Sequence, residues 1–143
     1  DQLASQLLEQ QQKVVSLTAY KVLSVELAAG LGHTFYDNET DYETVYFDQE
    51  IQHDFASWVS GDSMEPLYPN GSVALMKQTG FDYDGAVYAL IWNGKTYIKK
   101  VYREAEGLRL ESINPDYDDL FAPYEDEPKI VGIVVGHFLP LEV

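Results

Sequence analysis

The stretch AVYALIWNGKTYIKKVYR, residues 86–103, decides the fold class of this chain. Two runs rich in β-branched and aromatic residues, 86–92 and 95–103, flank the dipeptide of Asn93 and Gly94. Asn-Gly is the dipeptide that a two-residue type I′ turn prefers, because both central residues take a positive φ. The stretch therefore predicts a β-hairpin.

Runs of the same character recur on both sides of this hairpin. Further strands are expected at residues 44–47, 55–59, 72–77, 108–113 and 130–138. Turn signals separate them, among them DYDG, EG and NPD. Short strands at such regular spacing predict a mainly β, compact domain of strands and hairpins, either barrel-like or a sandwich.

The first 27 residues differ in character, because they contain no Gly or Pro and are rich in Leu, Gln, Ser and Ala. Their apolar residues recur at roughly helical spacing, which predicts a linker or connecting helix rather than core. The composition changes at Gly30, so we expect a segment 1–29 followed by a domain 30–143. The chain begins with Asp1 rather than Met, which indicates a fragment of a longer protein.

Composition argues against several functions. Nine Lys and Arg against 24 Asp and Glu give a net charge of −15, which repels phosphate backbones, so the chain by itself is not expected to bind nucleic acid. The absence of cysteine fits a reducing, cytoplasmic location and excludes thiolate metal sites. No apolar run is long enough for a membrane helix. The acidic stretch 117–128 matches no calcium loop and is expected to be a solvated loop, and we expect neither metal nor cofactor.

The stretch SGDSMEPLYPNG, residues 60–71, contains a candidate nucleophile, Ser63. A serine in such a turn is usually only a turn residue. Its hydroxyl becomes a nucleophile only when a neighbouring base takes its proton. That base is either a histidine or a lysine held neutral. None of the three histidines lies in a nucleophile-elbow motif, and spacing alone does not pair one with Ser63.

Lys99 and Lys100 are the lysine candidates, and neighbours on a strand point to opposite faces. One of them can therefore be buried beside the serine while the other is solvated. Lowering a lysine pKa from about 10.4 to about 7 costs roughly 4 kcal/mol, which only burial without a carboxylate partner supplies. Paired strand lysines otherwise protect a sheet edge from association, so the residues alone leave both interpretations open.

Several motifs in order resemble the LexA-like self-cleaving repressor domain, which phage repressors and UmuD mutagenesis proteins share. They are SGDSMEPLYPNG, LMK, VYALI, TYIKKV, GLRLESINPDY and IVGIVVG, between about residues 30 and 137. The resemblance implies a LexA/signal-peptidase-like β-domain. It also implies that Ser63, followed by Met64, is the nucleophile and that Lys99 is the general base, with Lys100 as a basic follower.

Members of this family cut their own chain at an Ala-Gly or Cys-Gly bond upstream of the serine. VELAAGLG supplies such a bond, so the resemblance implies cleavage between Ala29 and Gly30, with the backbone N–H groups of Asp62 and Ser63 stabilising the oxyanion. Relatives often carry Thr two residues before the base, where this chain has Tyr97, and what orients Lys99 stays open.

The carboxylates beside Ser63 carry an expectation of their own. A carboxylate near Lys99 would raise its pKa and slow the reaction. We therefore expect Asp62 and Glu65 to point away from Lys99.

The resemblance implies the C-terminal regulatory and dimerisation domain of a transcriptional repressor. It would form a homodimer, cleave itself in response to a RecA filament in the DNA-damage response, and reach operator DNA only through a DNA-binding domain absent from this chain. It would be cytoplasmic, with no membrane contact. The alternatives are a UmuD-like mutagenesis protein, a signal-peptidase-like protease acting in trans, and a binding module whose dyad is inert. The second is included because SMEP and YIKK also resemble the signal-peptidase family.

Overall fold

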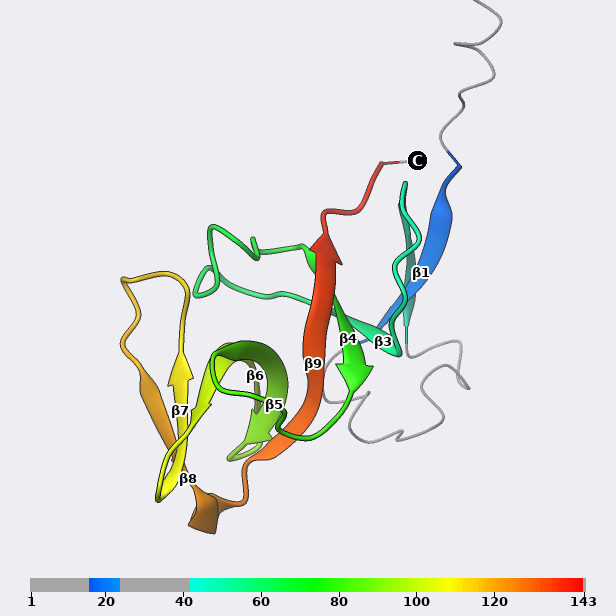
Figure 1. Cartoon of the computed structure of the whole chain (residues 1–143). Helices are drawn as coiled ribbons and strands as arrows, with labels where there is room; N and C mark the ends of the chain where they lie inside the picture. Colours follow the sequence, from blue (N-terminus) through cyan, green and yellow to red (C-terminus); the bar gives the residue numbers. More distant parts are fainter. Residues whose placement is uncertain (1–15, 24–41, 143) are drawn as a thin grey trace, which may run out of the picture.

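The computed structural model describes residues 16–23 and 42–142, and this part of the chain is almost entirely β-structure (Figure 1). Its strands form one mixed sheet in the order β2-β1-β3-β4-β9-β5-β6-β7-β8, and every neighbouring pair is antiparallel except β1 and β3. The elements are β1 Thr18–Leu23, β2 Glu43–Phe47, β3 Phe55–Trp58, β4 Val73–Gln78, β5 Ala86–Trp92, β6 Lys95–Arg103, β7 Gly107–Glu111, β8 Leu120–Pro123, a 3-10 turn η2 Tyr124–Asp126 and β9 Lys129–Phe138.

The hairpin expected from residues 86–103 is confirmed as β5 and β6. These strands pair along their whole length, from Ala86 opposite Val101 to Trp92 opposite Lys95. At the turn, Asn93 has a φ of 51° and Gly94 a φ of 73°. Both angles are positive, as a type I′ turn requires, so the Asn-Gly signal and the observed turn have the same physical cause.

The other expected strands are also confirmed, each to within a residue or two. The runs 44–47, 55–59, 72–77, 108–113 and 130–138 correspond to β2, β3, β4, β7 and β9. The prediction of a mainly β domain of short strands and hairpins is therefore correct. Three buried apolar clusters pack against different parts of this sheet.

Residues 18–23 correct the expectation of a helix or linker before Gly30. They form β1, which pairs with β2 and β3 and buries Tyr20, Val22 and Leu23. The Tyr20 hydroxyl donates to the carbonyl of Gln49 at 2.6 Å and accepts from the N–H of Ile51 at 3.0 Å. Tertiary pairing therefore overrides the weak helical spacing here. The expected boundary after residue 29 lies outside the described residues and stays a prediction.

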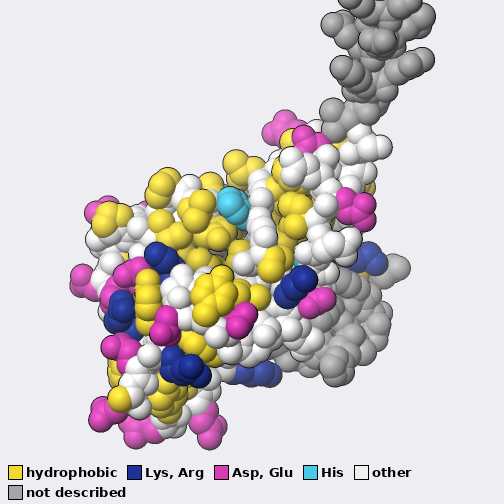
Figure 2. Space-filling model, in the orientation of Figure 1, with side chains coloured by type: hydrophobic (Ala, Val, Ile, Leu, Met, Phe, Trp, Pro, Cys, Tyr) yellow, Lys and Arg dark blue, Asp and Glu magenta, His cyan; other side chains and the backbone are white. Residues whose placement is uncertain are grey.

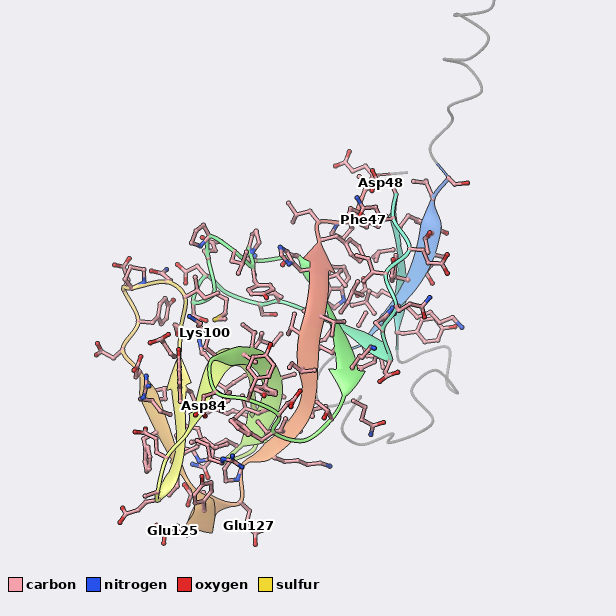
Figure 3. The ribbon with its side chains drawn as sticks, viewed as in Figure 1. Phe47, Asp48, Asp84, Lys100, Glu125 and Glu127 are labelled. Atoms are coloured by element: carbon pink, nitrogen blue, oxygen red, sulfur yellow. The ribbon has the colours of Figure 1, made fainter. Side chains whose placement is uncertain are left out.

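Residues 120–123 are a second correction, because the acidic stretch 117–128 was expected to be a solvated loop throughout. They form β8 at one edge of the sheet, paired with β7, and Ala122 is fully buried against the core. The acidic residues flank this short strand, and Glu125 and Glu127 project away from the sheet beyond it (Figure 3). A single inward alanine is a weak sequence signal for a strand.

β9 joins the two halves of the sheet, because it pairs with β4 on one side and β5 on the other. The register shifts between Leu75 and Met76 in the first pairing and between Ala89 and Leu90 in the second. A Cβ on Gly132 would lie 2.7 Å from the backbone oxygen of Lys77. β9 thus has one irregularity in each of its two pairings, and at Gly132 it approaches β4 too closely for a side chain.

The surface carries the charge imbalance of the sequence. Figure 2 shows acidic side chains distributed widely over one face, with fewer basic ones among them. Within residues 16–23 and 42–142, no helix has the length and apolar character needed to cross a membrane.

Candidate active site

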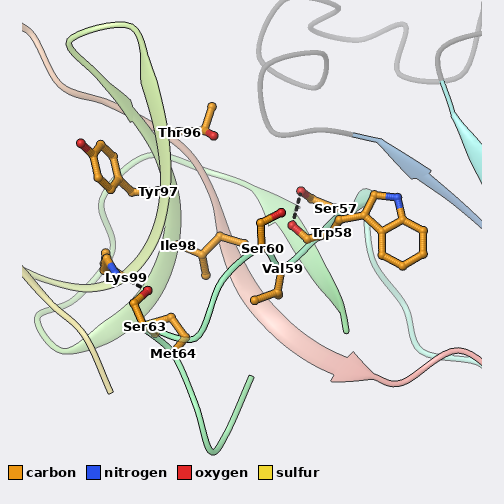
Figure 4. Close-up of a pocket in the computed structure, with 10 residues that line it drawn as sticks. All are labelled: Ser57, Trp58, Val59, Ser60, Ser63, Met64, Thr96, Tyr97, Ile98 and Lys99. Carbon is orange, nitrogen blue, oxygen red and sulfur yellow. Dashed lines mark hydrogen bonds between the residues drawn. The ribbon is translucent and has the colours of Figure 1, made fainter. Parts of the chain in front are cut away.

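Ser63 and Lys99 lie side by side, although they are 36 residues apart in the chain. Ser63 lies in the turn that follows β3, and Lys99 lies on β6. A hydrogen bond of 2.5 Å joins Lys99 Nζ and Ser63 Oγ (Figure 4). The structure thus brings together the two side chains that the resemblance singled out.

These two side chains meet in a cleft of about 300 Å³. Residues 57–60 line it from the end of β3, and residues 96–99 line it from β6, with Ser63 and Met64 at the end nearest Lys99 (Figure 4). Residues 57–58 and 96–99 of this lining belong to strands β3 and β6, and a cleft between strands suits an extended peptide. Thr96 and Tyr97 both contribute to it.

Met64 anchors the turn that contains Ser63. Its side chain is 2% exposed and belongs to the same buried cluster as Phe55, Met76 and Ala89. The neighbouring serine therefore sits on an anchored segment rather than on a free loop. This explains why a serine and a large apolar residue are adjacent here.

Lys99 is buried, and none of the described residues forms an ion pair with it. Its side chain is only 7% exposed, and burial lowers its pKa from the ordinary value of 10.5. Lys100 faces the other way and lies 3.5 Å from a Glu111 oxygen. The expectation that one lysine faces the serine while its neighbour is solvated is confirmed.

Asp62 and Glu65 both engage other groups. Asp62 Oδ1 accepts a hydrogen bond from the Tyr117 hydroxyl, and this bond raises the pKa of Tyr117. Glu65 Oε1 lies 3.4 Å from the backbone N–H of Asn70. These partners confirm that neither carboxylate pairs with Lys99, so nothing here opposes the effect of burial on the lysine.

The backbone around Ser63 is fixed by a distant segment. The N–H of Asn114 donates to the Ser63 carbonyl at 2.9 Å, and Asn114 Nδ2 donates to the Asp62 carbonyl at 3.0 Å. The N–H groups of Asp62 and Ser63 donate to no acceptor in the part of the chain that the structure describes. Two unpaired donors beside Ser63 are the arrangement that an oxyanion needs.

Ser112 is a member of the site that sequence reasoning missed. Lys99 Nζ donates to Ser112 Oγ at 2.8 Å, and Ser112 is 9% exposed. The β6–β7 pairing sets Lys100 opposite Glu111, so continuing the register by one residue sets Lys99 opposite Ser112. The signal was present in the sequence, because pairing the expected strands 95–103 and 108–113 about their turn gives the same juxtaposition.

The expected cleavage bond lies outside the described residues. Ala29 and Gly30 fall in the range 24–41, so their position relative to Ser63 stays a prediction.

The sequence profile of the Peptidase S24-like family matches residues 21–135, which include Ser63, Lys99 and Ser112. The chain therefore belongs to the Peptidase S24-like family, and the resemblance to LexA-like domains is confirmed. Ser63 and Lys99 are thus a serine and a lysine in contact within a peptidase-family domain.

Repressors are prominent among the similar proteins. Repressor protein CI of Enterobacteria phage phi80 is 42% identical over 77 residues, which cover 52% of this chain and 32% of that protein. LexA repressor of Lacticaseibacillus casei is 30% identical over 118 residues, covering 80% of this chain and 55% of that protein. LexA repressor of Citrifermentans bemidjiense is 33% identical over 86 residues, with 59% and 43% covered. The chain thus spans only part of the length of the relatives it matches.

Proposed function

We propose that this chain is the regulatory domain of a transcriptional repressor that cleaves its own backbone between Ala29 and Gly30 with a Ser–Lys dyad. The observation that carries the proposal is the 2.5 Å contact between Ser63 Oγ and Nζ of Lys99, which is buried and has no ion pair with any described residue. Membership of a peptidase family and similarity to proteins named repressors support it.

The proposed reaction starts with Lys99 neutral. Its Nζ takes the proton from the Ser63 hydroxyl, and Oγ attacks the carbonyl carbon of Ala29. The backbone N–H groups of Asp62 and Ser63 stabilise the oxyanion that forms. When the tetrahedral intermediate collapses, the bond to the Gly30 nitrogen breaks, and Lys99 returns its proton to that leaving amine. Water then hydrolyses the ester, which frees the Ala29 carboxylate and restores Ser63.

Regulation in this proposal acts on entry of the cleavage segment into the cleft. A tethered substrate needs no diffusional encounter, so the fraction of time that the segment is docked sets the rate. Docking also removes water from Lys99, which favours its neutral form. A RecA filament would stimulate cleavage by favouring the docked state, without adding a catalytic residue.

The remaining parts of the proposal concern partners. The acidic domain would form a homodimer, and operator DNA would be bound by a separate domain outside this sequence, because a net charge of −15 opposes contact with phosphates. Such a repressor would act in the cytoplasm, where the DNA is. No cofactor has a role in the reaction.

Incubation of the purified chain at pH 7 and pH 10, followed by intact mass spectrometry, tests the reaction. We expect two fragments that end at Ala29 and begin at Gly30. The rate should rise with pH and reach half its maximum below the ordinary lysine pKa of 10.5, because burial lowers the pKa of Lys99.

Ser63→Ala and Lys99→Ala should each abolish cleavage, by at least about a hundredfold. Lys100→Ala is the matched control, because Lys100 faces away from Ser63, and it should cleave at the parental rate. A chain that stays intact at pH 10 would favour the inert binding module. Cleavage that survives Lys99→Ala would show that another base serves Ser63.

A further inference from the structure

We propose that Ser112 is a positioning residue that orients neutral Lys99 so that its lone pair faces the Ser63 hydroxyl. This inference rests on the proposed self-cleavage. Ser112 Oγ is 2.8 Å from Lys99 Nζ, and Ser63 Oγ is 2.5 Å from the same atom.

The chemistry of a neutral amine makes such a partner necessary. A deprotonated lysine has two N–H donors and one lone pair, and rotation about the terminal C–N bond directs the lone pair anywhere on a circle. Only one orientation accepts the proton of Ser63. An acceptor that engages one of the N–H groups selects this orientation, and the Ser112 oxygen lies within hydrogen-bond distance to do so.

Ser112 is also held rigidly. It follows β7 directly and continues the register in which Val101 faces Leu110 and Lys100 faces Glu111. Two residues later, Asn114 donates to the carbonyl of Ser63. One short segment therefore fixes both reacting partners, with Ser112 on the lysine and Asn114 on the serine.

A hydroxyl suits this position because it carries no charge. Among the described residues, the Tyr117 ring also lies near Lys99, with its centre 5.8 Å from Nζ, and Tyr88 is opposite Lys99 on β5. The Tyr88 hydroxyl is occupied by the backbone of residues 82 and 83, and the Asp62 carboxylate is engaged by Tyr117. Ser112 thus orients the amine without stabilising its protonated form as a carboxylate would.

The test compares rate–pH profiles between pH 7 and 11 for the parent, Ser112→Ala, Ser112→Thr and Ser72→Ala. Ser72 is a matched control, because it is also a buried serine, 1% exposed, but its hydroxyl binds the carbonyl of Pro69, outside the cleft. Circular dichroism at each pH gives the folded fraction. The same four proteins and Lys99→Ala are also treated with a fluorophosphonate probe, and labelling of Ser63 is followed by mass spectrometry.

Ser112→Ala should lower the high-pH plateau of both cleavage and labelling by roughly ten- to a hundredfold, because the base is misoriented even when it is fully deprotonated. Its midpoint should not move to higher pH. Ser112→Thr should restore most of the plateau, and Ser72→Ala should match the parent. A purely structural role predicts loss only in proportion to the folded fraction, with no rescue by threonine.

The inference is overturned if Ser112→Ala cleaves and labels at the parental plateau rate, or if its loss follows the folded fraction. Failure of the proposed function looks different. In that case the parent stays intact at pH 10 while Ser63 is still labelled in a Lys99-dependent manner, and labelling of Ser112→Ala then decides the inference alone. A parent that is neither cleaved nor labelled overturns both.

Discussion

Lys99 shows how the burial of one ionisable side chain affects the stability of the fold. A buried lysine with no ion pair in the described ranges is unfavourable when protonated, and the fold reduces that cost by lowering its pKa. The hydroxyls of Ser63 and Ser112 keep the amine hydrogen-bonded in its neutral form. The lysine is thus solvated by two neutral groups rather than by a counter-ion.

Replacing Lys99 with an uncharged side chain should show directly how much stability its burial costs. In a Ser63→Ala background that prevents self-cleavage, we expect Lys99→Met to be more stable than its parent at pH 7, because methionine fills similar space without a charge to desolvate. Urea unfolding at pH 7, 8, 9 and 10 measures the difference between the two proteins.

That difference should shrink as the pH rises. The folded-state pKa of Lys99 lies below its unfolded value, so between the two the unfolded chain binds more protons and the lysine protein gains stability with pH. The penalty is complete below the folded pKa and disappears near the ordinary value of 10.5. An advantage of methionine that stays constant across this window would contradict a lowered pKa.

The elements of the sheet differ in how well the sequence predicts them. β5 and β6 are predicted to the residue, because two runs of β-branched and aromatic residues flank an Asn-Gly turn with two positive φ angles. β1 and β8 are missed, since their strand character comes from partners distant in the chain. Tyr20 is held by residues 49 and 51, and Ala122 alone anchors the centre of β8.

The residues of the candidate site also differ in how well the sequence predicts them. Ser63 and Lys99 are identified through motifs. Ser112 is identified only from the strand register of β6 and β7, and that register follows from the length of their turn once both strands have been predicted. The contacts of Asn114 with the Ser63 turn had no local signal, because they join residues about 50 positions apart. Sequence reasoning therefore reaches the reacting groups more easily than the residues that hold them.

Gly132 tests the packing of the central strand β9. A methyl group there would lie 2.7 Å from the Lys77 carbonyl and about 3.0 Å from the Phe55 ring, so β4 and β9 would have to separate. We expect Gly132→Ala to lower the free energy of unfolding by roughly 1–3 kcal/mol. Gly80→Ala is the control, because its Cβ would meet nothing within 4 Å, and should change stability by less than about 0.5 kcal/mol. Urea denaturation measures both, and equal effects would contradict the close approach.

At the scale of the whole molecule, the site depends on the last strand of the sheet. Ser63 belongs to the half formed by β1 to β4, and Lys99 belongs to the half formed by β5 to β8. β9 lies between β4 and β5 and pairs with both, so it joins the two halves, and the hydrogen bonds of Asn114 to the Ser63 turn join them a second time. The contact between Ser63 and Lys99 therefore joins two halves of the sheet, and the motifs around each residue do not by themselves show it.

This assembly also determines the kinetic order that we expect. If the cleavage segment is tethered to the same folded unit as Ser63, docking is unimolecular, and the fraction cleaved per unit time is independent of protein concentration. We expect first-order kinetics with one rate constant over a hundredfold range of concentration at pH 10, measured by mass spectrometry.

A mixing experiment distinguishes cleavage of the chain's own tethered segment from cleavage of another molecule in trans. Excess isotopically labelled Ser63→Ala chain is incubated with unlabelled parent, and cleavage of the labelled chain is followed by its mass. A segment that docks in its own cleft leaves the labelled chain intact while the parent is cut. Cleavage of the labelled chain at a rate that grows with parent concentration would contradict self-cleavage and favour a protease acting in trans, as a signal-peptidase-like enzyme would, because only an encounter between molecules depends on concentration.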